Sequence, residues 1–213
     1  MSDRKADGEL IDISPAITSA IAVFPGDTPF SRRVLLDMAD GANLTLSTME
    51  TTLHLGSHAD AESHYAIDGR TIESMPLELY VGACDVVEVT PSAGERVQVD
   101  DIHGEIVSPR VLIRTGTQPD KNVFGGYCGL SPALVHHLAT RRVRLIGVDT
   151  PSVDPGDSKA LEAHAACREH GIAIIEGLVL DGVPLGQYEL IALPLKIVGG
   201  DASPVRAVLR RLG

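Results

Sequence analysis

The amino-acid sequence predicts one α/β domain whose sheet is mixed or antiparallel and partly closed into a barrel. The chain has 213 residues, a length typical of a single α/β or barrel domain. Hydrophobic residues make up 44% of it and aromatic residues only 3%, so a packed core must consist mainly of aliphatic side chains. Short strands separated by prolines come first, and strands alternate with helices after Val111.

The first half of the chain predicts strands and turns. Residues 1–8 are polar and are expected to be flexible, so the domain is expected to span residues 9–213. Apolar and polar residues alternate along residues 44–50, which indicates a strand. Further strands are predicted at 10–13, 33–37 and 83–89, and a short helix or turn at 71–80.

The second half predicts two helices between buried strands. Ser131 as N-cap and Pro132 at the first helical position predict a helix over residues 131–140. A second helix is predicted to begin at Asp157 or Ser158 and to end at His170, because Gly171 is a stop signal. Apolar runs predict strands at 111–115, 143–149, 172–176, 190–193 and 205–209.

Composition excludes several classes of protein. A net charge of −11 disfavours a nucleic-acid partner, because binding phosphates requires clustered Lys and Arg. The three cysteines, Cys84, Cys128 and Cys167, form no C-x-x-C pair and fit a reducing compartment better than a disulfide framework. The start of the chain lacks the apolar centre of a signal peptide, and no run of 18 apolar residues occurs. We therefore expect a soluble, cytoplasmic protein with no membrane partner.

The most informative segment is L-H-L-G-S-H-A-D-A-E-S-H-Y at residues 53–65. A straight strand would point His54, His58, Asp60 and His64 to one face, but it would place the first and last of them roughly 33 Å apart. A helix would align the first two histidines and turn Asp60 away from both. Because Gly56 tolerates unusual backbone angles, we expect a strand that ends in a tight bend and folds several ligands around one point.

Imidazole and carboxylate together are typical ligands of Zn²⁺, Mn²⁺ or Fe²⁺, whereas Mg²⁺ and Ca²⁺ prefer oxygen alone. Two further ligands are candidates. His164 lies on a small, apolar helix face, and Glu176 ends an apolar strand. Each also has a purely structural explanation, a helix–sheet contact for His164 and a cap or salt bridge for Glu176. Asp149 ends a strand in the same way, and the residues alone do not rank it.

Other chemistries leave weaker signals. The fragment Gly129–Ala133 lacks the last glycine of a G-x-S-x-G elbow, and no P-loop or G-x-G-x-x-G occurs. Pairing of a cysteine with a histidine in space stays open. Hydrolysis by metal-activated water remains, with a non-catalytic metal-binding or sensor protein as the alternative. The remaining histidines are expected to be solvated: His103, His136, His137 and His170.

The segment from His54 to His64 resembles the H-x-G-[TS]-H-x-D-x-P-x-H signature of the cyclase family of metal-dependent hydrolases. The resemblance extends over nearly the whole chain. It includes VFPGDTPF, GVDTPSVDP with DSKALEAH, IIEGLVLDGVP and YELIALPLKIVGGDASPVRAVLR. The later stretches are similar to the kynurenine formamidase (arylformamidase) branch of that family.

This resemblance implies a swivelling β/β/α fold with a mixed, partly barrel-like sheet flanked by helices, and a homodimer. It also implies two divalent metal ions, most often Zn²⁺, with Mn²⁺ as the other candidate. His54, His58 and Asp60 would hold the first ion, Asp60 would bridge to the second, and His164 and Glu176 would complete the shell. His64 would be the proton donor and acceptor. The reaction implied is hydrolysis of N-formyl-L-kynurenine to kynurenine and formate, a step of tryptophan degradation.

Two residues depart from the family pattern. Glu62 stands where proline is usual, and the sequence leaves open whether its carboxylate faces the site or solvent. Phe24 stands at a position associated with substrate contact, where tryptophan is usual; it can stack on an aryl ring but cannot donate an indole N–H. Both departures keep open another amide substrate, for instance a cyclic, isatin-like amide.

Overall fold

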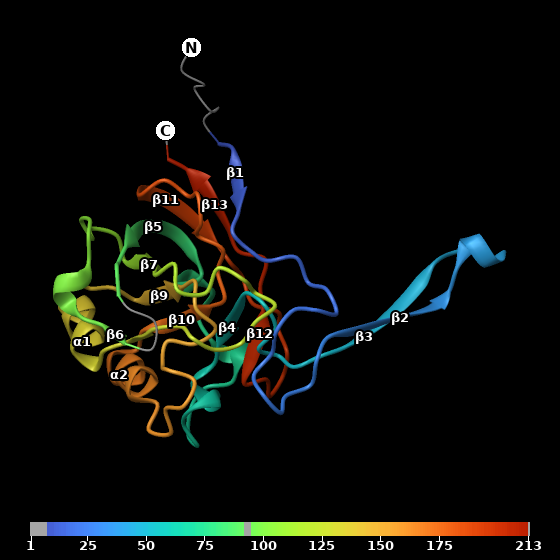
Figure 1. The fold of residues 1–213 in the computed structure, drawn as a ribbon, viewed down its shortest axis with the longest axis horizontal. Coiled ribbons are helices and arrows are strands. Elements are labelled where there is room, and N and C mark those ends of the chain that lie inside the picture. The colour runs from blue at the N-terminus through green and yellow to red at the C-terminus, as the bar shows by residue number, and fades with distance from the viewer. Residues whose placement is uncertain (1–7, 92–94, 213) are drawn as a thin grey trace, which may run out of the picture.

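A computed structural model describes residues 8–91 and 95–212. Its centre is a nine-stranded sheet that curls into a half-barrel (Figure 1). The strands lie in the order β1 (Leu10–Asp12), β13 (Val208–Arg211), β11 (Gly186–Ile191), β5 (Val81–Glu88), β7 (Arg110–Arg114), β9 (Leu145–Val148), β10 (Ala173–Glu176), β4 (His58–Asp60) and β12 (Ala202–Pro204). Neighbours from β5 to β10 are parallel and the outer pairs antiparallel, so the predicted mixed α/β sheet is confirmed.

Each face of the sheet has its own core, because successive strand residues point to opposite sides. Helices α1 (Pro132–Thr140) and α2 (Glu162–His170) lie side by side on one face (Figure 1). Val111 and Ile113 of β7 pack in the core under these helices, whereas Leu112 packs in the core inside the curl. Gly147 of β9 also faces the inner core, where an added Cβ would lie 2.5 Å from Leu112 Cδ2.

A hairpin, β2 (Ser31–Leu36) with β3 (Leu46–Glu50), projects away from the body of the molecule (Figure 1). It confirms the two strands predicted there, and all its strand residues are exposed. The short elements outside the two larger sheets, among the described residues, are β6 (Arg96–Val97), β8 (Gly129–Leu130) and the 3₁₀ turns Met38–Asp40, Glu62–His64, Ile72–Ser74, Leu77–Leu79 and Val99–Asp101. Two of these turns fulfil the prediction of a short helix or turn at 71–80.

The predicted start of the second helix is wrong. Helix α1 begins as predicted, with the Ser131 hydroxyl accepting a hydrogen bond from Leu134 N at 3.1 Å. Helix α2 begins only at Glu162, because Leu161 has the left-handed φ of 47°. The cap is Asp154, whose carboxylate accepts from the backbone N–H groups of Ala163 and His164 at 3.1 Å. The predicted end of the helix at His170 is confirmed, and Gly171 follows with a left-handed φ of 62°.

The predicted C-terminal strands are also partly wrong. The strand predicted at 205–209 begins only at Val208, in β13, because Ala207 N donates to the Ser14 hydroxyl at 2.8 Å and not to a neighbouring strand. The strand predicted at 190–193 begins earlier, at Gly186, and ends at Ile191. The strand cannot continue far beyond Ile191, because Pro194 has no backbone N–H to donate to a neighbouring strand.

The three cysteines are free and buried. In the described parts of the chain, no helix is both long enough and apolar enough to cross a membrane. The expected flexible segment 1–8 lies outside the described residues, apart from Gly8.

Candidate metal centre

The histidine-rich segment bends as its spacing predicts. Gly56 has φ of 58°, in the left-handed region, and the chain turns there before entering β4. The ring centroids of His54 and His64 lie 4.1 Å apart, against the roughly 33 Å of a straight strand. The structure therefore brings all four even-numbered residues to one place.

Strand register brings the distant carboxylate to the same place. In the antiparallel pair β4–β10, His58 lies directly opposite Glu176, and Asp60 is two residues along on the same face. His164, from α2, covers that face and is 2% exposed. The approach of the two backbones requires glycine at 177, where φ is 69° and a Cβ would lie 2.2 Å from the carbonyl oxygen of Gly56.

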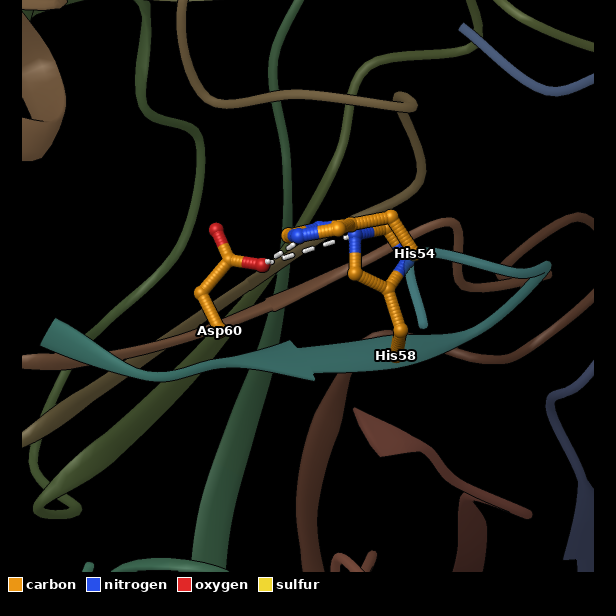
Figure 2. Close-up of side chains that lie close together, drawn as sticks. All are labelled: His54, His58 and Asp60. Carbon is orange, nitrogen blue, oxygen red and sulfur yellow. Dashed lines mark ion pairs between the residues drawn. The ribbon is translucent and has the colours of Figure 1, made fainter. Parts of the chain in front are cut away.

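Asp60 lies at the centre of the cluster, and each of its oxygens faces a different side. Oδ1 lies 3.2 Å from His54 Nδ1 and 3.5 Å from His58 Nε2 (Figure 2). Oδ2 lies 3.3 Å from His164 Nε2. The Glu176 carboxylate joins both sides, at 3.2 Å from His58 Nε2 and 3.6 Å from His164 Nε2. Asp60 is therefore shared by two groups of possible metal donors, one with His54 and His58 and the other with His164 and Glu176.

Each of the three inner histidines is held by its other ring nitrogen. His164 Nδ1 donates to Asp154 at 2.8 Å, and His58 Nδ1 donates to the carbonyl of Gly56 at 3.0 Å. His54 Nε2 lies 3.3 Å from the Asp201 carboxylate. Such outer partners fix the tautomer of a metal-binding histidine and leave the inner nitrogen free for the ion.

Sequence reasoning missed both Asp154 and Asp201. Their segments, SVDPG and VGGDASP, carry neither the helical nor the strand period that places a side chain on a face. The available signal was an isolated carboxylate in an otherwise small and apolar segment.

The donor set fits a divalent metal ion. Among the described residues, His58 Nε2 and Asp60 Oδ1 are buried side-chain atoms with no hydrogen-bond partner. Burying a polar atom without a partner is costly, and an ion bound between these two atoms would supply one to each. A mixture of imidazole and carboxylate is the donor set that zinc and its neighbours prefer.

The cluster is strongly coupled electrostatically when no metal is bound. Burial lowers the pKa of His54, but the adjacent Asp60 carboxylate outweighs it and raises that pKa to about 9. In His164, burial is outweighed by the hydrogen bonds to Asp154 and Asp60, which raise its pKa to about 10. Burial raises the pKa of Asp60, but His164 and His54 hold it well below its usual range.

These shifts predict how the stability of the metal-free protein depends on pH. The pKa values of His54 and His164 are higher in the folded chain than the ordinary 6.5, so their contribution is complete below pH 6.5 and is lost as pH rises toward 9 and 10. Urea unfolding in excess chelator should therefore show a falling free energy of unfolding between pH 6.5 and 9. A free energy that rose over this range would contradict the assignment.

His64 lies beside the cluster and is more accessible than the other three histidines. Its side chain is 34% exposed, and its Nδ1 lies 3.8 Å from Asp201 Oδ2. Burial lowers its pKa below the ordinary value. Its ring nitrogens come within 4.8 Å of two donor groups, one formed by His54 and Asp201 and the other by Asp60 and His164. Geometry thus admits His64 as a proton carrier or as a further ligand.

The other sequence candidates lie outside the centre. Glu62 turns to Arg70, with Oε2 3.1 Å from Arg70 Nε, so its carboxylate does not face the metal cluster. Asp149 accepts hydrogen bonds from the backbone of Thr115 and Gly116 at 2.9 to 3.0 Å, and so joins the ends of β7 and β9. Of the histidines expected to be solvated, three are exposed and one is half-buried: His103, His136, His170 and His137.

A cavity of about 570 Å³ opens beside the cluster. His54, His58, His64, His164 and Glu176 form one part of its wall. Another part is aromatic, where the rings of Phe24 and Phe124 meet edge to face at 5.3 Å. Phe24 therefore lines the cavity, with 53% of its surface exposed, and its contact with substrate stays a prediction.

The outer partner of His164 gives a testable prediction. Asp154→Asn keeps the side-chain shape but removes the carboxylate that orients His164 Nδ1, so metal affinity should fall roughly 10- to 100-fold. Competition with a chromogenic chelator measures that affinity. Glu162→Gln is the matched control, because Glu162 contacts Arg96, the same arginine that contacts Asp154. Equal affinities in the Asp154 variant and the control would contradict the orienting role.

Comparison with known proteins agrees with this architecture. The model of a family described as putative cyclase matches residues 11–155. The fold is similar to that of a potential metal-dependent hydrolase with cyclase activity, at 27% identity, TM-score 0.82 and coverage of 96% of this chain and 99% of that one. A predicted metal-dependent hydrolase from Bacillus stearothermophilus has 28% identity and TM-score 0.80 over 96% and 98%. An isatin hydrolase bound to the product analogue thioisatinate shares the fold, with 20% identity and TM-score 0.84 over 97% and 94%.

Proposed function

The chain belongs to the cyclase family, and from that premise we propose that it is a metal-dependent hydrolase of N-formyl aryl amines, with N-formyl-L-kynurenine as its substrate. One observation carries the proposal. Three histidines and two carboxylates converge in a buried cluster in which His58 Nε2 and Asp60 Oδ1 have no hydrogen-bond partner among the described residues, beside a cavity with an aromatic wall. The names of two relatives, at 27% and 28% identity, support metal-dependent hydrolysis.

We assign the ligands by the two sides of Asp60. His54, His58 and Asp60 would hold one divalent ion, and Asp60, His164 and Glu176 the other, with Zn²⁺ favoured and Mn²⁺ as the alternative. When bound, such ions lower the pKa of a water ligand toward 7 and polarise a carbonyl oxygen.

His64 would carry the proton. Hydrolysis forms a bond between water oxygen and the formyl carbon, breaks the C–N bond, and releases formate and the aryl amine. The amine leaves readily only if its nitrogen is protonated, and His64 is accessible from the cavity. Because its pKa is lowered, its ring is neutral at pH 7 and can accept the proton of water and then donate it to the leaving nitrogen.

The cavity wall supports an aryl substrate that carries a carboxylate. Phe24 and Phe124 present ring edges and faces on which an aniline ring can pack. Lys121 is the only Lys or Arg among the described residues that line the cavity. Burial lowers its pKa, and its ammonium donates to the carbonyl of Asp149, with no carboxylate of the described residues within salt-bridge distance. A substrate carboxylate would give it a partner.

The test is a turnover assay coupled to elemental analysis of the same protein sample. We expect two divalent ions per chain and faster hydrolysis of N-formyl-L-kynurenine than of isatin. Preference for isatin would replace the proposal with cyclic-amide hydrolysis. Metal-loaded protein that cleaved neither amide would favour the non-catalytic metal-binding alternative, and active protein with only trace metal would contradict the metal-dependent mechanism.

We further propose that the enzyme is a cytoplasmic homodimer held by the β2–β3 hairpin. Three free, buried cysteines support a reducing compartment. The projecting hairpin carries large exposed apolar side chains, among them Met38 at 62% and Met49 at 66% exposure. A two-stranded ribbon is only marginally stable alone in water, and an apolar surface of this kind is typical of an interface. A second copy of the chain would cover it.

Analytical ultracentrifugation tests the assembly. Leu36→Lys/Met49→Lys places two charges on the hairpin and should shift the protein from dimer to monomer. Val107→Lys, at a position that is 60% exposed outside the hairpin, is the control and should stay dimeric. A monomeric wild type, or a dimer that tolerates both charges, would remove the hairpin from the interface.

A further inference from the structure

The His64 side chain is not fixed by hydrogen bonds of its own. Among the described residues its ring nitrogens have no partner within 3.5 Å, and Asp201 is the nearest carboxylate at 3.8 Å. Its ring packs against the rings of His54, His164 and Tyr65, at 4.1, 5.9 and 6.2 Å between centroids, and these contacts supply no hydrogen bond. Its direction is therefore set mainly by the backbone of residues 62–70.

An ion pair closes this backbone segment into a loop. Glu62 Oε2 accepts from Arg70 Nε at 3.1 Å and from the Arg70 backbone N–H at 3.2 Å, while Oε1 accepts from Arg70 Nη2 at 2.5 Å. The backbone N–H of Ser63 returns a hydrogen bond to the carbonyl of Arg70 at 3.0 Å. The carboxylate thus grips both the guanidinium and the main chain at the far end of the loop.

The two ends of the loop are in direct backbone contact. A Cβ on Gly69 would lie 2.3 Å from the carbonyl carbon of Glu62, so only glycine fits there. A second ion pair, between Asp68 and Arg168, ties the same loop to α2, the helix that supplies His164. The Glu62–Arg70 pair is bidentate, and bidentate arginine–carboxylate pairs contribute more to stability than other surface ion pairs.

We propose that Glu62 and Arg70 are positioning residues that clamp the loop and hold the His64 imidazole against the metal cluster. The clamp acts through the main chain, since His64 directly follows Ser63 and its own N–H donates to the carbonyl of Ala61 at 3.1 Å. The inference rests on the proposed function, because it takes His64 as the residue that protonates the leaving amine. Glu62, two residues from Asp60 in sequence, serves the proton carrier and not the metal.

The test uses ring-substituted formanilides whose amine products differ in basicity. A misplaced proton donor slows substrates with a basic leaving amine more than 4-nitroformanilide, whose amine leaves with little help. For Glu62→Ala we expect kcat on basic-amine substrates to fall about 10- to 100-fold, the cost of a displacement near 1 Å, with KM and metal content unchanged. Glu62→Arg/Arg70→Glu restores the ion pair but not the bond to the backbone N–H of residue 70, and should recover part of the loss.

Arg206→Gln is the matched control, because it removes an arginine–carboxylate pair, to Asp12, outside the site. A Glu62→Ala enzyme with the wild-type dependence on leaving-group basicity would overturn the clamp. So would a reversed pair as slow as the single variant. Hydrogen exchange at the amides of residues 63–69 is a second measurement, independent of turnover: exchange should accelerate in Glu62→Ala, and unchanged exchange would overturn the clamp. A wild type that cleaved no formanilide would instead count against the proposed function, and the clamp would be judged by exchange.

Discussion

Asp60→Asn is expected to remove both metal ions and with them nearly all activity. Asparagine has almost the same shape, but it offers one neutral oxygen where the carboxylate turns Oδ1 toward His54 and His58 and Oδ2 toward His164. Loss of a shared ligand should exceed the roughly 10- to 100-fold effect typical of removing an outer partner. Metal content per chain by elemental analysis and kcat/KM on N-formyl-L-kynurenine measure the two effects.

A spectroscopic readout separates this result from misfolding. In the metal-free protein Asp60 raises the pKa of His54, so in the asparagine variant that pKa should fall well below about 9. NMR titration of the ring protons in excess chelator follows it, and a folded spectrum confirms intact structure. Retention of two ions by Asp60→Asn would mean that the carboxylate is not their shared ligand.

The histidine cluster was predictable because its information is local. Even-numbered spacing places His58 and Asp60 on one face of a short strand, and Gly56 marks the bend that returns His54 to them. The candidates His164 and Glu176 were visible as polar residues on apolar elements, and the structure brings both to the cluster. To bring Glu176 to the cluster, the chain needed only to pair β4 with β10.

The features that the sequence did not predict depend on contacts between side chains that neither the helical nor the strand repeat reveals. The cap of α2 is Asp154, eight residues before the helix, so local signals at Asp157 and Ser158 misplaced its start. Asp201 reaches His54 from a loop before β12. The direction of Glu62 follows from Arg70, which the chain brings back by a turn that only Gly69 permits. In each case the deciding contact joins two irregular segments, where neither helical nor strand geometry constrains the side chain.

Three histidines of the cluster differ from the fourth in a way that bears on their roles. His54, His58 and His164 each have a second partner that fixes the ring, whereas His64 has none within 3.5 Å among the described residues and is 34% exposed. A metal-binding histidine is oriented better when a hydrogen bond at its second ring nitrogen fixes the ring. A proton carrier must exchange its proton with substrate and then with solvent, which requires access and a nitrogen free of a permanent partner.

His64→Gln should therefore lower kcat without releasing metal. Glutamine is similar to histidine in size and can form hydrogen bonds, but it does not gain or lose a proton near pH 7. The kcat should therefore fall roughly 10²- to 10⁴-fold, the usual contribution of general acid–base catalysis. The loss should be largest for formanilides with basic leaving amines and smallest for 4-nitroformanilide. In the wild type, the acid limb of kcat/KM should lie below pH 6.5, because burial lowers the pKa of His64, and this limb should vanish in the variant.

Metal analysis decides between the two roles that the geometry admits for His64. Its nitrogens lie within 4.8 Å of donor atoms of His54 and Asp201 on one side and of Asp60 and His164 on the other, so a ligand role would cost the glutamine variant one ion. Two ions retained with kcat reduced would assign proton transfer to His64. One ion lost in proportion to activity would make His64 a ligand, and the proton would then have to be carried by another group of the cavity wall. Full activity with both ions in place would exclude His64 from either role.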